Sequence, residues 1–183
     1  MRVSDSIAII SDVHGNRHAL EAVRRAQRQA GITRTWCLGD MVGYGAHPNE
    51  CLRACVHASE RCLAGNHDLA AAGRVPVDVF SPWARTAIEW TRTRLDRNAL
   101  ERLDGGLVRG EETISLDRGR WLVNPGSVGQ PRDLDPRASW AVLDPDANTL
   151  TFRRTPYDVP GAQNAIQAAG LPVELGSRLA EGR

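Results

Sequence analysis

Residues 7–16 read Ile-Ala-Ile-Ile-Ser-Asp-Val-His-Gly-Asn, and this segment decides the fold. Its apolar run predicts a buried strand over 7–10, and Asn16 is a residue that can begin a helix. Residues i and i+2 of a strand point to the same side, so Asp12 and His14 are expected to converge on one point. The segment therefore predicts a strand that delivers a carboxylate and an imidazole to its own end. The alternative is a strand end whose polar residues only cap the next helix.

Two later strands end in the same way. A predicted strand over 35–38 stops at Gly39-Asp40, and one over 61–64 stops at Gly65-Asn66-His67-Asp68. In an open α/β sheet, ligands bind at the edge where such strands end, so the three ends are expected to be neighbours. The loop 41–48 between them has enough glycine to wrap closely around a ligand. For Asn66 and His67 the alternative is a tight turn with a helix cap.

The composition is that of an ordinary globular protein. The chain has 183 residues, a net charge of +1, 42% hydrophobic residues and 25% charged residues, which gives no electrostatic reason to expect nucleic-acid binding. All 23 basic residues are arginine, which excludes a lysine nucleophile or Schiff base. The sequence shows no apolar run as long as a membrane span and no signal peptide, which favours a cytoplasmic protein.

Four cysteines, at positions 37, 51, 55 and 62, occur in a chain without an export signal, so a disulfide framework is not expected. Their spacing favours buried small hydrophobic residues over a thiolate metal site.

The remaining pattern predicts one domain over 1–183, without repeats or a linker. Hydrophobic spacing, caps and turn residues indicate where its elements lie. Helices are expected over 16–30, 48–58, 82–95, 98–103, 159–169 and 172–180, and hairpins over 113–124 and 139–153.

Four segments in order resemble signatures of one family. Ser11–Asn16, Gly39–Gly45 and Gly65–Asp68 resemble the first three signatures of the calcineurin-like metallophosphoesterases. Residues 122–132, together with 135–139, resemble the C-terminal signature of the small bacterial branch of that family. The resemblance covers most of the chain. It implies an α/β fold, a layered αββα sandwich of two mixed sheets with outer helices.

The resemblance also implies roles for the residues at the strand ends. Asp12 and His14 would hold a first metal ion, Asp40 would bridge to a second, and Asn66 would bind the second. His67 would act as general acid or stabilise the phosphate charge, with Asp68 hydrogen-bonded to its far nitrogen. Arg132 or Arg137 would contact a phosphate, unless their segment is only a structural loop. Such ligands suit manganese, iron, zinc or nickel.

The chain departs from the family in its histidines. These are residues 14, 18, 47, 57 and 67, whereas the family carries two further histidine signatures after the third strand. The chain resembles a member with an internal deletion. The first metal site would keep three ligands and the second only Asp40 and Asn66, so we expect one firmly bound ion and a weak second site. His47 is the nearest substitute ligand, while His57 sits on a predicted helix.

These observations lead to three hypotheses. The first is a metal-dependent phosphoesterase that hydrolyses phosphate esters through a metal-bound hydroxide. Its activity would be reduced, because only one of the two metal ions that stabilise the attacking and leaving oxygens would be firmly bound. The second is a degenerate member that binds metal or a phosphate ligand without turnover. The third is a structural or interaction module. The substrate class is left open beyond a phosphorylated small molecule or phosphoester, and the surface uncovered by the deletion would be exposed or masked by a second copy of the chain.

Overall fold

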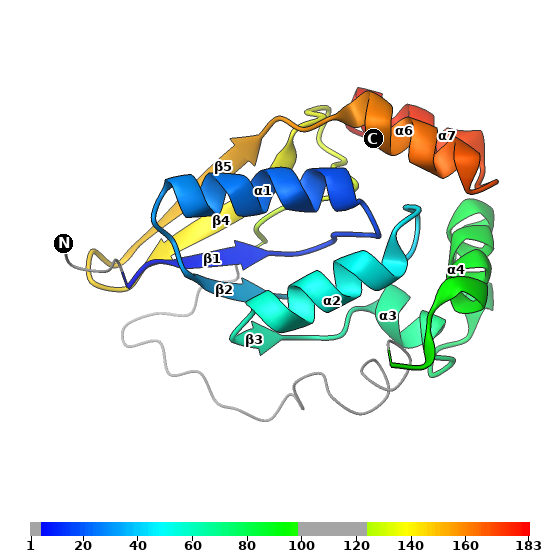
Figure 1. Cartoon of the computed structure of the whole chain (residues 1–183), viewed down its shortest axis with the longest axis horizontal. Helices are drawn as coiled ribbons and strands as arrows, with labels where there is room; N and C mark the ends of the chain where they lie inside the picture. The colour runs from blue at the N-terminus through cyan, green and yellow to red at the C-terminus, as the bar shows by residue number, and fades with distance from the viewer. Residues whose placement is uncertain (1–4, 99–123) are drawn as a thin grey trace.

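The computed structural model describes residues 5–98 and 124–183, and in these ranges the strands form one five-stranded sheet (Figure 1). The strand order is β3-β2-β1-β4-β5. The first three strands are parallel, and β4 and β5 are antiparallel to their neighbours. The sheet is therefore mixed. The strands are β1 (Ile7–Ile10), β2 (Arg34–Cys37), β3 (Arg61–Cys62), β4 (Ala138–Asp144) and β5 (Thr149–Thr155).

Helices connect the parallel strands and cover the sheet. Helix α1 begins after Asn16, whose side chain accepts a hydrogen bond from the Ala19 amide, and α2 begins at a proline that has no N–H to leave unpaired. In Figure 1, α6, α7 and α4 lie beyond the ends of β1 to β3, where the site is expected. The helices are α1 (Arg17–Gln29), α2 (Pro48–Ala58), α3 (Asn66–Ala71), η1 (Val77–Val79), α4 (Pro82–Arg94), α6 (Val159–Ala168) and α7 (Val173–Glu181).

The main core lies between the sheet and helices α1 and α2. Ala8 and Ile10 of β1 are buried there against Leu20 and Val23 of α1, and Trp140 of β4 joins the same cluster. Burial of these side chains fixes which face of β1 each residue occupies, because a one-residue slip would turn its apolar side chains outward. The position of the β1 end, and so of Asp12, follows from this packing.

The predicted α/β class is confirmed, and most predicted elements are found to within one or two residues. Helix α3 is an exception, because it was not among the predicted helices and a helix cap was only the alternative for Asn66 and His67. The expected second sheet is not seen in the described residues. The helix expected at 98–103 and the hairpin at 113–124 fall mostly on residues outside the described ranges.

All four cysteines are free and buried, as expected for small hydrophobic residues. Within 5–98 and 124–183, none of the helices combines the length and apolarity needed to cross a membrane.

Candidate metal centre

The segments that follow β1 and β2 continue side by side past the ends of the strands. The Asp12 amide donates to the Gly39 carbonyl at 3.0 Å, and the His14 amide donates to the Asp40 carbonyl at 2.9 Å. These bonds extend the pairing of the parallel strands. They bring Asp12 and His14 next to Asp40, although helix α1 and strand β2 separate them in the chain.

The backbone at these residues is left-handed. The φ angles of Asp12, His14 and Asp40 are 54°, 50° and 53°. The expectation that alternation along a strand brings Asp12 and His14 together was wrong, because β1 ends at Ile10 and the turns after it do so instead. Left-handed backbone is unfavourable for residues with a side chain and gathers at functional sites. Three such residues in one place therefore indicate a site.

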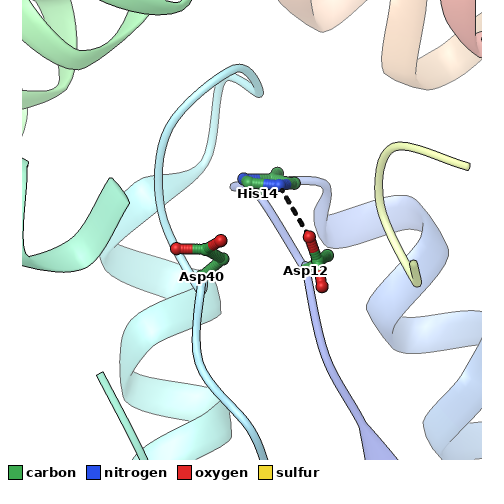
Figure 2. Close-up of side chains that lie close together, drawn as sticks. All are labelled: Asp12, His14 and Asp40. Carbon is green, nitrogen blue, oxygen red and sulfur yellow. Dashed lines mark ion pairs between the residues drawn. The ribbon is translucent and has the colours of Figure 1, made fainter. Parts of the chain in front are cut away.

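Asp12, His14 and Asp40 each offer a ligand atom, and these atoms all lie within 4.8 Å of one another. Figure 2 shows the first two on the segment after β1 and Asp40 on the neighbouring segment. His14 is 1% exposed, and its Nδ1 lies 3.2 Å from the carbonyl oxygen of Val42. A carbonyl can only accept, so Nδ1 is the donor, and in the neutral ring Nε2 then carries the lone pair.

Nε2 of His14 has no hydrogen-bond donor among the residues that the structure describes, and Oδ1 of Asp12 lies 3.4 Å away. A lone pair beside carboxylate oxygens is satisfied by a cation placed between them. Two carboxylates and one imidazole are hard to borderline ligands, and three protein ligands with open positions are typical of catalytic metal sites. The residues present therefore fit one divalent cation.

The two carboxylates differ in their protonation. Burial acts to raise the pKa of Asp12, but the His14 ring whenever it is protonated, the hydrogen bond from Ser11 and the charge of Arg132 lower the pKa overall. Burial raises the pKa of Asp40, and the attraction of His14 offsets this only in part. Without a cation, Asp40 therefore carries the less favourable negative charge of the two.

The start of α3 lies against Asp40. The His67 amide donates to Oδ1 of Asp40 at 2.9 Å. A Cβ atom on Gly65 would lie 2.0 Å from the same oxygen, so only glycine allows this approach. Asn66 is exposed and stands between these two residues. The backbone on both sides of Asn66 therefore contacts Asp40, and the role of the Asn66 side chain as a ligand stays a prediction.

His67 is buried among aromatic rings, with 4% of its surface exposed. Its ring centroid lies 4.7 Å from that of His14, 4.6 Å from that of Tyr44 and 5.0 Å from that of Phe80. Its Nδ1 has no hydrogen-bond partner in the described part of the chain. Burial lowers the pKa of His67 to about 3, helped by repulsion from His14 and Arg132. The ring is therefore neutral at ordinary pH.

Asp68 does not hydrogen-bond the far nitrogen of His67, and this expectation was wrong. Its Oδ1 accepts from the amides of Met41 and Val42 at 2.9 and 3.1 Å, and its Oδ2 accepts from the Gly65 amide at 3.0 Å. Asp68 therefore ties the loop after β2 to the start of α3. Burial raises its pKa to about 7, against the three backbone bonds that favour the carboxylate.

Of the two predicted arginines, the structure brings only Arg132 to the site. Arg132 lines a cavity together with Asp12, and its positive charge lowers the pKa of Asp12 and of Asp40. Arg137 instead pairs with Asp135, with its Nη2 2.6 Å from Oδ2 of Asp135, and it does not line the cavity. The sequence reasoning missed Arg154 of β5, which does line it.

His47 precedes α2, and its ring lies 5.9 Å from that of His18. It is not part of the group of metal-ligating atoms found in the described residues. His47 therefore does not act as the substitute metal ligand that the sequence suggested.

Known proteins resemble this chain along most of its length. Residues 6–143 match the model of the calcineurin-like phosphoesterase family. The uncharacterized protein MJ0912 of Methanocaldococcus jannaschii is 31% identical, over 99% of this chain and 100% of its own. That alignment runs over 242 residues, more than the 183 of this chain, so the relative has internal residues that this chain lacks.

Two solved structures share the fold. A metallophosphoesterase from Sphaerobacter thermophilus superposes with a TM-score of 0.81 at 33% identity, over 98% of this chain and 100% of that one. The hypothetical protein PH1004 from Pyrococcus horikoshii OT3 superposes with a TM-score of 0.78 at 19% identity, over 97% of this chain and 98% of its own, and shows the fold alone. Since the matched segment spans most of the chain and contains Asp12, His14 and Asp40, the chain belongs to the calcineurin-like phosphoesterase family.

Proposed function

We propose that the chain hydrolyses phosphate esters with one firmly held divalent cation bound by Asp12, His14 and Asp40. The observation that carries this proposal is the convergence of their three ligand atoms within 4.8 Å, with Nε2 of His14 3.4 Å from Oδ1 of Asp12. Manganese, iron, zinc and nickel all suit these ligands. When bound, the cation supplies Lewis-acid charge at the phosphate and activates a water molecule for attack on phosphorus.

We propose that Asp40 is also a ligand of a second, weakly held cation, with the amide oxygen of Asn66 as its other protein ligand. Asn66 follows Gly65, whose backbone lies against the Asp40 carboxylate. One shared carboxylate and one neutral amide provide little negative charge at this second position, so a cation is expected to bind there weakly. We therefore expect turnover to be orders of magnitude lower than with two firmly held cations.

The neighbouring residues would handle the phosphate. His67 is proposed to donate a hydrogen bond from its neutral ring to a phosphate or leaving-group oxygen, because its lowered pKa disfavours the imidazolium needed for a strong general acid. Arg132 would pair with the phosphate charge. Asp68 acts as a positioning residue that holds the loop after β2 in place.

A second candidate is a protein that binds a metal ion or a phosphate ligand without turnover. It is favoured by the small ligand group, since in the described residues only three metal-ligating side chains of the histidine, cysteine and acidic types come together. Both candidates predict metal uptake. Only the first predicts hydrolysis.

Elemental analysis combined with an aryl phosphate assay in excess manganese tests the two candidates. The wild-type chain should bind at least one equivalent of metal, and His14→Ala should lose it. Asp40→Asn should lose most activity, whereas His57→Ala, an exposed histidine on α2, should change neither metal content nor rate. Full activity in Asp40→Asn would rule out its role as a ligand. Metal uptake without any hydrolysis would favour the binding protein.

Three broader expectations stay proposals. We propose that residues 1–183 act as one domain in the cytoplasm and that the substrate is a phosphorylated small molecule or another phosphoester. We also propose that the surface left by the missing internal residues is either exposed or covered by a second copy of the chain.

A further inference from the structure

A cavity of about 450 Å³ lies beside the candidate metal centre, with Asp12 in its wall. The rest of its lining comes from the loop that precedes β4 and from the β4–β5 hairpin. Its volume is in the range of small-molecule sites, about 300–1,000 Å³. It is far larger than a phosphate group needs. The surplus space is therefore available to the alcohol part of an ester.

Two arginines line the cavity, alongside the carboxylates of Asp12 and Asp133. Arg132 lines the cavity together with Asp12, and its guanidinium lies 5.9 Å from the ring centroid of Tyr44. Arg154 is held in place by an ion pair with Asp133, which also lines the cavity. Arg154 is thus already paired, whereas Arg132 is the arginine suited to a phosphate oxygen.

Gln130 supplies an unused hydrogen-bond donor in the same wall. Its side chain is 1% exposed, and its Nε2 has no partner among the described residues. The loop around it is ordered by hydrogen bonds, because Ser127 Oγ donates to the Asp12 carbonyl at 3.0 Å and accepts from the Gln130 amide at 2.9 Å. A buried amide group without a partner is unfavourable, so a ligand that accepts a hydrogen bond there gains affinity.

Phe152 adds an exposed aromatic surface to this polar cavity. It lies on β5 opposite Ala141, and 60% of its surface is exposed. Residues two apart on a strand share one face, so Phe152 and Arg154 point to the same side of the sheet. An exposed ring next to arginines is the arrangement that binds a planar base together with a phosphate.

We propose that this cavity binds the alcohol part of the phosphate ester and that this part is a nucleoside, with its base stacked on Phe152. Arg132 binds the phosphate, and Gln130 donates to the sugar or base. The inference rests on the proposed function for the ester, but ligand binding itself requires no turnover.

Binding of AMP and of ribose 5-phosphate to the full chain tests the proposal, because these ligands differ only in the base. Titration calorimetry in EDTA prevents hydrolysis. AMP should bind about tenfold or more tightly than ribose 5-phosphate, as expected for one stacked base. Phe152→Leu should remove this preference. Trp83→Leu is the matched control, since Trp83 is 44% exposed on α4 and does not line the cavity.

Equal affinities in the wild-type chain, no binding of AMP at millimolar concentration, or a preference that survives in Phe152→Leu would each overturn the inference. Thermal unfolding of both variants verifies that the fold is retained. The aryl phosphate assay in manganese reports separately on the proposed function. A chain that prefers AMP but does not hydrolyse aryl phosphate would refute the proposed function and support the binding site, and the reverse result would refute only the site.

Discussion

Nε2 of His14 lies 3.4 Å from Oδ1 of Asp12, while Nδ1 of the same ring lies 3.2 Å from the carbonyl oxygen of Val42. The second contact fixes the tautomer, and the first turns a lone pair toward a carboxylate. Each contact comes from a different segment, because Val42 follows β2 whereas Asp12 and His14 follow β1. The pairing of β1 with β2 therefore also orients the imidazole.

Removal of divalent metal should lower the thermal stability of the chain. A ligand at about 100 times its Kd stabilises a folded protein by about 2.7 kcal/mol, which for a chain of this size raises Tm by about 5 °C or more. Differential scanning calorimetry with EDTA and then with added manganese measures the shift. Asp40→Asn should show a much smaller shift. If wild type has the same Tm in both buffers, no site of useful affinity is present.

Asp68→Asn should destabilise the fold by about 1–3 kcal/mol. The carboxylate accepts three backbone hydrogen bonds, and an asparagine NH₂ group would face one of these N–H donors. Urea unfolding measures the change. Asp78→Asn, at an exposed aspartate of η1, is the control and should stay within about 0.5 kcal/mol of wild type. Equal stability of the two variants would contradict the positioning role of Asp68.

Gly43→Ala should be more harmful than Gly31→Ala. Both glycines have positive φ, at 86° and 70°, so both substitutions strain the backbone. Only at Gly43 would the new Cβ meet a neighbour, 2.4 Å from Nδ1 of His67. We expect Gly31→Ala to cost about 1 kcal/mol and keep its activity. Gly43→Ala should lose more stability and most activity, as measured by denaturation and phosphate release.

His67 should make the metal-free chain less stable as pH falls. Burial lowers its folded pKa to about 3, whereas the unfolded chain has the ordinary value near 6.5. The unfolded state therefore binds the proton first, so this contribution is present above pH 6.5 and is lost as pH falls toward 3. His67→Gln should remove that part of the pH dependence. The difference between the two Tm profiles in EDTA measures it, and parallel profiles would contradict it.

Much of the fold could be predicted because local signals agree with it. Asn16 and Pro48 are strong helix starts, and the apolar run at residues 7–10 has one stable place in a sheet. The convergence of Asp12, His14 and Asp40 was also expected. Its cause was not, since left-handed backbone at residues with a side chain is a tertiary effect that no local pattern reports.

The partners of single side chains were less predictable. The sequence places Asp68 next to His67. Its carboxylate nevertheless accepts hydrogen bonds from the amides of Met41 and Val42, which lie 27 and 26 positions earlier in the chain. Arg137 lies in the expected signature but pairs with Asp135 two residues away, while Arg154 reaches the cavity from the next strand. Strand alternation across the β4–β5 hairpin was the available signal for Arg154.

The left-handed turns at Asp12, His14 and Asp40 have a kinetic consequence. Because backbone hydrogen bonds between the segments after β1 and β2 hold these turns, we expect ion uptake to need no refolding of the loops. Capture should then be limited by how quickly the ion sheds its water. Ligands held on fixed turns adjust their positions little to the bound ion. We therefore expect affinity to depend on the ionic radius of the metal more than on its charge.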